Sequence, residues 1–427
     1  MQLRHLVATL ALAPAVAVAQ PAPGPETPYP AEAPAAPVTP ENADLPGPEV
    51  APVAAEPPAP ETPAAAPAKK GAVSVRYDKG LLFETEDGGY ALKLGIRSQF
   101  RLEATRPHGD DTEFATRFMI PRLRLQFEGH AFDDLIDYKV EFEMANRGFS
   151  LLKDFFIDRA FTKTVHLRVG QWKRPFHRQE VASDFGSEFL ERTVVNEFAT
   201  AGRDLGVALH NDYEKSPDGL EWAAGVWNAG SDRSTIRSSC VPGATPTDPP
   251  ICTISTPTNV PSDWGPALVA HVGWNGGGIK GYSEGDLEGG PLRYGVSVDY
   301  RMNPRDLDKN ADGDLQIQHA VSLDTIIKRE GVCASGALVL IKDGQADPEL
   351  GFYGQLSYLV KGPGVLVAGR FAQVPDDDEH RREIAGAVNL LWRGHNLKWM
   401  IDGGILQTTG DGGGNDLRIR TQLQASL

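Results

Sequence analysis

The residues with the clearest chemical potential are arginines that recur at every second or fourth position within segments of alternating polarity. A guanidinium presents paired N–H donors in one plane, which suits oxyanions such as carboxylate and phosphate. Four further basic residues flank or lie in a long connection at 174–202. The candidates for contact with an anion are Arg97, Arg101, Arg122, Arg124, Arg168, Lys173, Arg174, Arg178, Arg203, Arg418 and Arg420.

The sequence offers little for catalysis. It contains no Cys/His cluster with zinc spacing and no nucleophile elbow, so we predict no enzymatic activity, no metal site and no cofactor. Segment 308–319 opens with the ligand spacing of a calcium loop, but His319 stands where a bidentate Glu is needed. We interpret it as a solvated turn, with calcium binding as the alternative. The glycine run 276–281 is interpreted as a flexible turn.

The three cysteines divide into a pair and a single residue. Cys240 and Cys252 lie twelve positions apart in a proline-containing connection at 229–263, whereas Cys333 is distant. We predict a disulfide between the first two and a free thiol at Cys333.

The arginines are positioned by strands with one apolar and one charged face. Segments 90–104, 121–129, 137–145 and 416–427 alternate apolar and polar residues with period two, which is typical of β-strands. The same pattern predicts sixteen strands between 90 and 427, with an extra strand at 81–86. Segment 276–290 is too long for a simple turn in this scheme.

Two architectures produce such alternation, a soluble sandwich and a transmembrane barrel. Long strands, charge-dense polar faces and an even strand count favour an all-β antiparallel barrel in a membrane. The seven tryptophans lie near predicted strand ends, as aromatic girdles at the two membrane interfaces would. A secreted soluble β-rich binding protein is the alternative.

Composition adds limits and domain boundaries. The 427 residues carry a net charge of −15, which argues against nucleic acid as a partner, and no apolar run is long enough for a spanning helix. We predict a signal peptide over 1–19, which ends in Ala17-Val18-Ala19, and a Pro/Ala-rich disordered spacer over 20–70. The spacer is either a passive tether or a contact to peptidoglycan. The barrel then occupies 71–427, and we expect its connection 174–202 to fold inward and constrict the lumen.

Several consecutive stretches resemble the phosphate-selective porin O and P family of Gram-negative outer membranes. The most diagnostic are VGQWKRPF (169–176), FLER (189–192) and GRDLGV (202–207). The resemblance implies a trimeric sixteen-stranded barrel in outer-membrane lipid that passes small anions, often phosphate, with the spacer in the periplasm. It also implies a ladder of inward arginines for anions, formed by Arg97, Arg101, Arg122, Arg124, Arg168, Arg418 and Arg420. A general non-selective porin, with these arginines paired to carboxylates, is the alternative. Leu427 departs from the aromatic residue that usually ends such barrels.

Overall fold

The structure is a computed structural model that describes residues 73–427 with gaps at 110–112, 134, 146–151, 200–201, 230–236, 242–250, 256–264, 310–314, 363, 377–378 and 411. The predicted signal peptide (1–19) and spacer (20–70) lie outside the described residues, as does the centre of the calcium-like segment 308–319. Among the described residues, no helix has the length and apolar character to cross a membrane.

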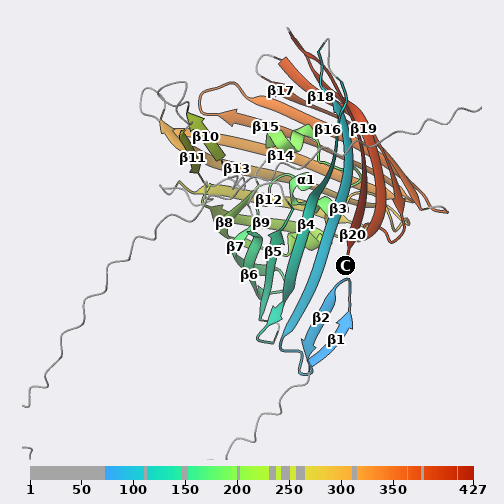
Figure 1. The fold of residues 1–427 in the computed structure, drawn as a ribbon. Helices are drawn as coiled ribbons and strands as arrows, with labels where there is room; N and C mark the ends of the chain where they lie inside the picture. The colour runs from blue at the N-terminus through green and yellow to red at the C-terminus, as the bar shows by residue number, and fades with distance from the viewer. Residues whose placement is uncertain are drawn as a thin grey trace, which may run out of the picture. The chain divides into compact units, whose positions relative to one another are not determined.

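Sixteen antiparallel strands of the described chain form one closed barrel (Figure 1). Each strand pairs with the next along the chain, and β20 returns to β3. This confirms the sixteen predicted strands. Their bounds are β3 (Ala91–Arg106), β4 (Ala115–Ala131), β5 (Ile136–Glu143), β6 (Leu152–Thr162), β7 (Val165–Lys173), β8 (Arg203–His210), β9 (Gly219–Trp227), β12 (Ala267–Gly276), β13 (Arg293–Lys309), β14 (Leu315–Arg329), β15 (Val332–Asp343), β16 (Glu349–Val360), β17 (Val365–Asp376), β18 (Glu379–Leu391), β19 (Leu397–Thr408) and β20 (Gly414–Ser426).

The barrel closes at its last residue. The amide of Leu427 donates to the carbonyl of Ile96 at 2.8 Å, and the amide of Ile96 donates back at 2.9 Å. Beyond this point β3 pairs with a hairpin formed by β1 (Val73–Tyr77) and β2 (Leu81–Thr85). The predicted strand at 81–86 is therefore confirmed, whereas its partner β1 was not predicted. Closure at this seam leaves β3 and β20 without an open edge.

Side chains alternate between an apolar outer face and a polar inner face. On β13, the outward Val296 and Val298 are 42% and 50% exposed, whereas the inward Asp299 and Arg301 are 1% and 3% exposed. The same contrast recurs along β3, β14 and β19. A closed barrel with apolar residues outside and charged residues inside requires an apolar medium around it and water within it.

The tryptophans correct one expectation. Trp274, Trp392 and Trp399 are 41–55% exposed on the outer surface, as a girdle requires. Trp172 and Trp227 instead point inward and are 2% and 1% exposed, with ring centroids 5.4 Å apart. Proximity to a strand end therefore did not fix which face these two side chains occupy. Trp264 lies outside the described residues.

The barrel has two different ends, named here by their connections. The turn end carries mostly short turns and the β1–β2 hairpin, together with η2 (Tyr213–Lys215) and segment 277–292. The loop end carries the longer connections, among them 174–202 and the one that contains β10 (Arg237–Val241) and β11 (Ile251–Ser255). Segment 277–292 forms no strand of the barrel and turns back into the lumen.

Connection 174–202 is named here the constriction loop, and its described residues 174–199 lie inside the barrel (Figure 1). It contains α1 (Arg178–Val181), η1 (Asp184–Gly186) and α2 (Val194–Ala199). Phe176, Phe189 and Val195 on this loop are at most 1% exposed. Most of its apolar side chains must leave water, so the loop packs against a wall instead of hanging in the lumen.

That wall is an unusual stretch of the barrel interior. Ala320, Ala337, Val339 and Ala372 of β14, β15 and β17 point inward and form one buried cluster with Phe176, Val194 and Val195 of the loop. Small apolar side chains leave room for the loop and offer it no polar partner. One half of the lumen is therefore filled by packed side chains and is named here the dry core. The cavities lie on the side formed by β3–β7 and β20, which is named here the water-filled side.

Segment 277–292 meets the constriction loop from the turn end. The Glu284 carboxylate accepts from the backbone amide of Glu188 at 2.9 Å, and the Gln355 amide donates to Glu188 at 2.5 Å and to Glu284 at 3.2 Å. Lys398 Nζ donates to the carbonyl of Ser187 at 2.6 Å. These contacts join the loop, the segment and the barrel wall at one buried point.

We expect thiol labelling to detect the disulfide predicted above. β10 pairs with β11 so that Cys240 lies directly opposite Cys252 in the register. Closing a loop of this size stabilises a chain by roughly 3 kcal/mol. Under denaturing conditions without reductant, a maleimide should modify Cys333 alone, and C240S should make Cys252 reactive. Labelling of all three cysteines in the unreduced protein would contradict the bridge.

We also expect the constriction loop to loosen as pH rises. Burial and the nearby Glu284 carboxylate raise the pKa of Glu188 to about 7. The folded state therefore keeps a proton between the usual pKa of a Glu and pH 7 that the unfolded state releases, and stability falls as pH rises through this window. The full effect is about 3 kcal/mol at most.

Hydrogen exchange of peptides that cover 184–199, corrected for intrinsic rates, measures this loosening. Protection should fall between pH 5 and pH 8 in the natural protein, and E188Q should flatten the dependence. E197Q is the control, because Glu197 is 69% exposed on the same loop. A pH profile that is identical in E188Q and the natural protein would be inconsistent with this role.

Candidate functional site: the water-filled side of the lumen

Six of the predicted arginines form a column along β20, β3 and β4, on the side of the lumen that the constriction loop leaves open. The register places Arg97 opposite Arg124, Arg122 opposite Gln99, and Arg101 opposite Gln422. We name Arg97, Arg101, Arg122, Arg124, Arg418 and Arg420 the arginine column. Arg418 and Arg420 lie nearest the loop end, Arg101 and Arg122 in the middle, and Arg97 and Arg124 nearest the turn end.

Neutral amides orient the middle of the column. Arg101 Nε donates to Gln422 Oε1 at 2.9 Å, and Arg122 Nη1 donates to Gln99 Oε1 at 3.0 Å. Both glutamines come from the same inward face as the arginines. Each of these two guanidinium groups thus has one neutral side-chain partner besides its carboxylate partners.

The constriction loop brings two carboxylates to the column. Asp184 accepts from Arg124 Nη2 at 2.7 Å, and Glu191 contacts Arg122 at 2.7 Å and Arg101 at 2.6 Å. Burial acts to raise the pKa of both acids, but the facing guanidinium groups outweigh it and hold each pKa well below its usual range. Both side chains are therefore ionised at neutral pH.

The barrel wall supplies the remaining counter-charges. Glu143 pairs with Arg124 at 2.9 Å, and Asp402 pairs with Arg420 at 2.6 Å. Each member of the column has a carboxylate within 4 Å; the longer contacts are Arg97 to Glu141 at 3.5 Å and Arg418 to Glu383 at 3.1 Å. The arginine column is therefore a row of cationic groups. Carboxylates of the constriction loop and of the barrel wall compensate most of its charge.

Three other predicted residues lie on the opposite flank of the open side. Arg168 pairs with Asp158 at 2.8 Å, and Arg203 pairs with Asp154 at 2.7 Å. Lys173 Nζ donates to the carbonyls of Glu180 and Ala182 of the loop at 2.6 and 2.8 Å. These cations line the lumen, and Lys173 also fastens the loop.

Arg174 and Arg178 differ from the expectation that they face the narrowest part of the lumen. They are 4% and 5% exposed within the packed half of the barrel. Arg174 lies 3.6 Å from Asp204, and the Arg178 guanidinium stacks 4.1 Å from the ring centroid of Tyr282. Because the loop packs against the wall, both side chains are buried and contact other residues of the protein instead of the open lumen.

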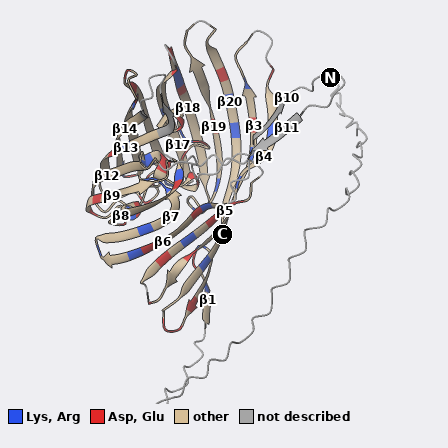
Figure 2. Cartoon of the chain, turned by 90° about the vertical axis from the view of Figure 1, so that its left-hand side faces the viewer, with Lys and Arg blue, Asp and Glu red and all other residues tan. Residues whose placement is uncertain are grey.

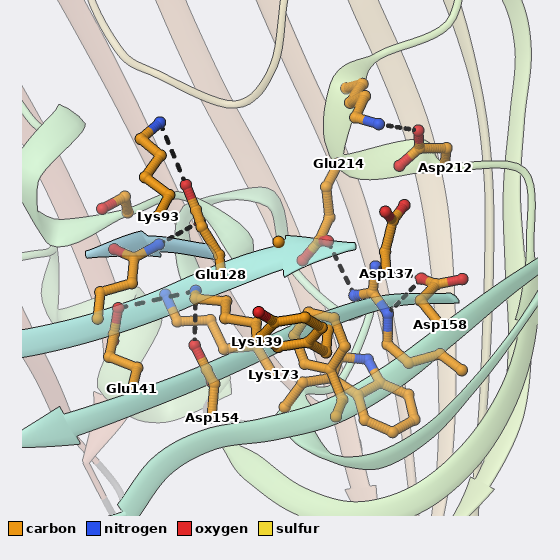
Figure 3. Close-up of a pocket in the computed structure, with 18 of the residues that line it drawn as sticks. Lys93, Glu128, Asp137, Lys139, Glu141, Asp154, Asp158, Lys173, Asp212 and Glu214 are labelled. Carbon is orange, nitrogen blue, oxygen red and sulfur yellow. Dashed lines mark hydrogen bonds and ion pairs between the residues drawn. The ribbon is translucent and has the colours of Figure 1, made fainter. Parts of the chain in front are cut away.

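A cavity of about 720 Å³ extends from the turn end to the constriction loop. Its lining mixes both charge signs: Lys93 pairs with Glu128 at 3.4 Å, and Lys139 with Asp154 at 2.8 Å (Figure 3). Figure 2 shows both blue and red segments on several strands of the barrel. A second cavity of about 350 Å³ at the loop end is lined in part by Arg418. Arg101, Arg122 and Glu191 lie at the level between them.

The loop acids and their supports were not predicted from the sequence. Asp184 and Glu191 reach the column only because the loop folds inward, and Arg192 pairs with Asp184 at 3.0 Å. Arg370 of β17 donates to the carbonyl of Glu191 at 2.8 Å and pairs with Glu383 at 2.5 Å. The one signal available was the FLER motif, in which Glu191 and Arg192 stand together.

Comparison with solved structures identifies the fold. An anion-selective porin from Comamonas acidovorans aligns with a TM-score of 0.51 and 11% identity, covering 79% of this chain and 100% of that one. A loop-deleted OmpT, an outer membrane protein of Vibrio cholerae, aligns with a TM-score of 0.50 and 10% identity, covering 78% and 99%. No curated protein matches the sequence.

The family model of phosphate-selective porin O and P matches residues 91–245. This span runs from the first barrel strand through the constriction loop to β10 and includes four members of the arginine column. The chain therefore has the fold of a porin barrel, and its residues 91–245 match the model of the phosphate-selective porin O and P family.

Proposed function

We propose that this protein is an outer-membrane channel for the passive diffusion of small anions, with phosphate or polyphosphate as its solutes. The observation that carries the proposal is the arginine column, which lies along the water-filled side of the lumen at the level of the constriction loop. The family match and the porin fold support the channel class. The structurally similar porin from Comamonas acidovorans is anion-selective, which agrees with this assignment.

Selectivity depends on the charges at the constriction and not on those of the whole chain. The net charge of the sequence is −15, but an ion in transit interacts with the groups at the narrowest level. Low-dielectric walls on both sides focus the field of those groups. Guanidinium pairs can replace part of the hydration shell of an oxyanion, and several such sites in series let it enter and leave.

A general non-selective porin is the second candidate, and one observation favours it. The carboxylates paired with each member of the column compensate most of its charge. A compensated lumen discriminates weakly between ions of opposite sign. Ion selectivity, measured as a reversal potential, distinguishes the two candidates.

The remaining assignments follow from the channel class. We propose that the outward apolar band contacts outer-membrane lipid, that the turn end faces the periplasm, and that the spacer 20–70 lies there as a tether or in contact with peptidoglycan. We further propose a homotrimer, which chemical cross-linking of the detergent-solubilised protein would test.

Neutralising the column should change selectivity. In R122Q/R124Q, two positive charges leave the lumen while Asp184, Glu141 and Glu143 remain, so we expect the reversal potential in a salt gradient to shift toward cations. Planar-bilayer recording measures the shift, and heat-modifiable gel mobility verifies the folded barrel.

The matched control is R159Q/R329Q, which removes two exposed arginines outside the arginine column. It should leave the reversal potential unchanged. A natural channel that already prefers cations would refute anion selectivity and favour the general porin.

A further inference from the structure

Glu191 occupies the middle of the arginine column in the way that a bound oxyanion would. One carboxylate oxygen lies 2.6 Å from Arg101 Nη1, and the other lies 2.7 Å from Arg122 Nη2. A third contact joins Arg122 Nη1 to Oε1 at 3.5 Å. A single carboxylate thus bridges two guanidinium groups from adjacent strands, with a planar donor array on each side.

The two arginines do not need Glu191 to hold their positions. Gln422 and Gln99 accept hydrogen bonds from them at 2.9 and 3.0 Å, and the carbonyl of Leu190 accepts from Arg101 Nη2 at 3.0 Å. Asp184 lies 3.4 Å from Arg122 Nε. The donor array would therefore persist if the carboxylate moved away.

The loop backbone does not need the Glu191 side chain either. Arg370 donates to the carbonyl of Glu191 at 2.8 Å, and the Asp402 carboxylate accepts from the amide of Leu190 at 3.0 Å. The Phe189 side chain next to it is 1% exposed and packs under the Arg370 guanidinium at 4.2 Å. The side chain of Glu191 can rotate while its backbone stays in place.

Access differs among the three groups. The Arg101 side chain is 1% exposed and that of Arg122 is 15% exposed, whereas that of Glu191 is 30% exposed. Water and solutes in the lumen therefore reach the carboxylate first, and the guanidinium groups lie behind it.

We propose that Arg101 and Arg122 form an oxyanion-binding site that Glu191 occupies as a tethered competitor. A permeating oxyanion binds between the two arginines by displacing this carboxylate. A tethered group acts at an effective concentration of about millimolar or more, so it weakens binding of a free anion without abolishing it. Glu191 thereby sets both the affinity and the dwell time of the anion. This inference rests on the proposed anion channel.

The test is block of chloride current by inorganic phosphate in planar bilayers. E191Q keeps the shape of the side chain but removes its charge, so phosphate should block at a roughly tenfold lower concentration, the scale of a charge-assisted hydrogen bond lost by the competitor. E197Q is the control, because it removes an equal charge from the same loop. Glu197 is 69% exposed and lies 3.5 Å from Arg381. Phosphate should block the E197Q channel at the same concentration as the natural channel.

E191D provides a second variant that keeps the charge. Its shorter side chain cannot bridge both arginines as closely, so its half-blocking concentration should fall between those of E191Q and the natural channel. Equal phosphate block in the natural channel, E191Q and E191D would overturn the tethered competitor while leaving the anion channel intact. Cation selectivity in both the natural channel and E191Q would instead overturn the anion channel itself.

Discussion

The packing of the constriction loop against an apolar inner wall is the interaction on which the rest of the structure depends. Phe176, Phe189 and Val195 leave water completely, and full burial of each such side chain contributes about 1.5–3 kcal/mol. Phe176 and Val195 pack in a cluster with Ala and Val of the wall strands, and the guanidinium groups of Arg301 and Arg370 cover the rings of Phe176 and Phe189. This packing divides the lumen into a dry half and a water-filled half and places Asp184 and Glu191 opposite the arginines.

Charge pairing in the water-filled half follows from that division. A guanidinium held against protein on one side loses part of its hydration, so a buried cation without a counter-ion would be costly. The loop acids and the wall acids meet this requirement for Arg124 and Arg420. The same pairing lowers the net potential of the column, so selectivity depends on which carboxylates move and which are fixed. Asp184 is 6% exposed and has several partners, whereas Glu191 is 30% exposed.

Segment 277–292 gives the loop a second support from the opposite end of the barrel. The Glu284 carboxylate accepts a hydrogen bond from the backbone amide of Glu188. On the barrel wall, Lys398 of β19 donates a hydrogen bond to the carbonyl of Ser187. The two in-folded segments meet at one buried point, which leaves the loop backbone little freedom around 184–191. A constriction held from both ends keeps the backbone of Asp184 and Glu191 at a constant position relative to the arginines.

The sequence by itself determined the strands, because alternation with period two is a local property that each strand displays on its own. It also determined the membrane-barrel class and the inward direction of Arg97, Arg101, Arg122, Arg124, Arg418 and Arg420, since strand phase fixes the face. It indicated that 174–202 is long enough to fold inward. The charge-free stretch VCASGALVLI (332–341) is the local sign of the dry wall in the sequence.

Only the tertiary structure decided where the loop packs and which residues it brings together. Arg174 and Arg178 belong to the loop's own packing, and Trp172 and Trp227 fill the dry core instead of a girdle. Glu191 reaches Arg101 across 90 positions of sequence. Such contacts depend on the register of the whole closed barrel and on the complementary volumes of loop and wall, and neither quantity is encoded in any one segment.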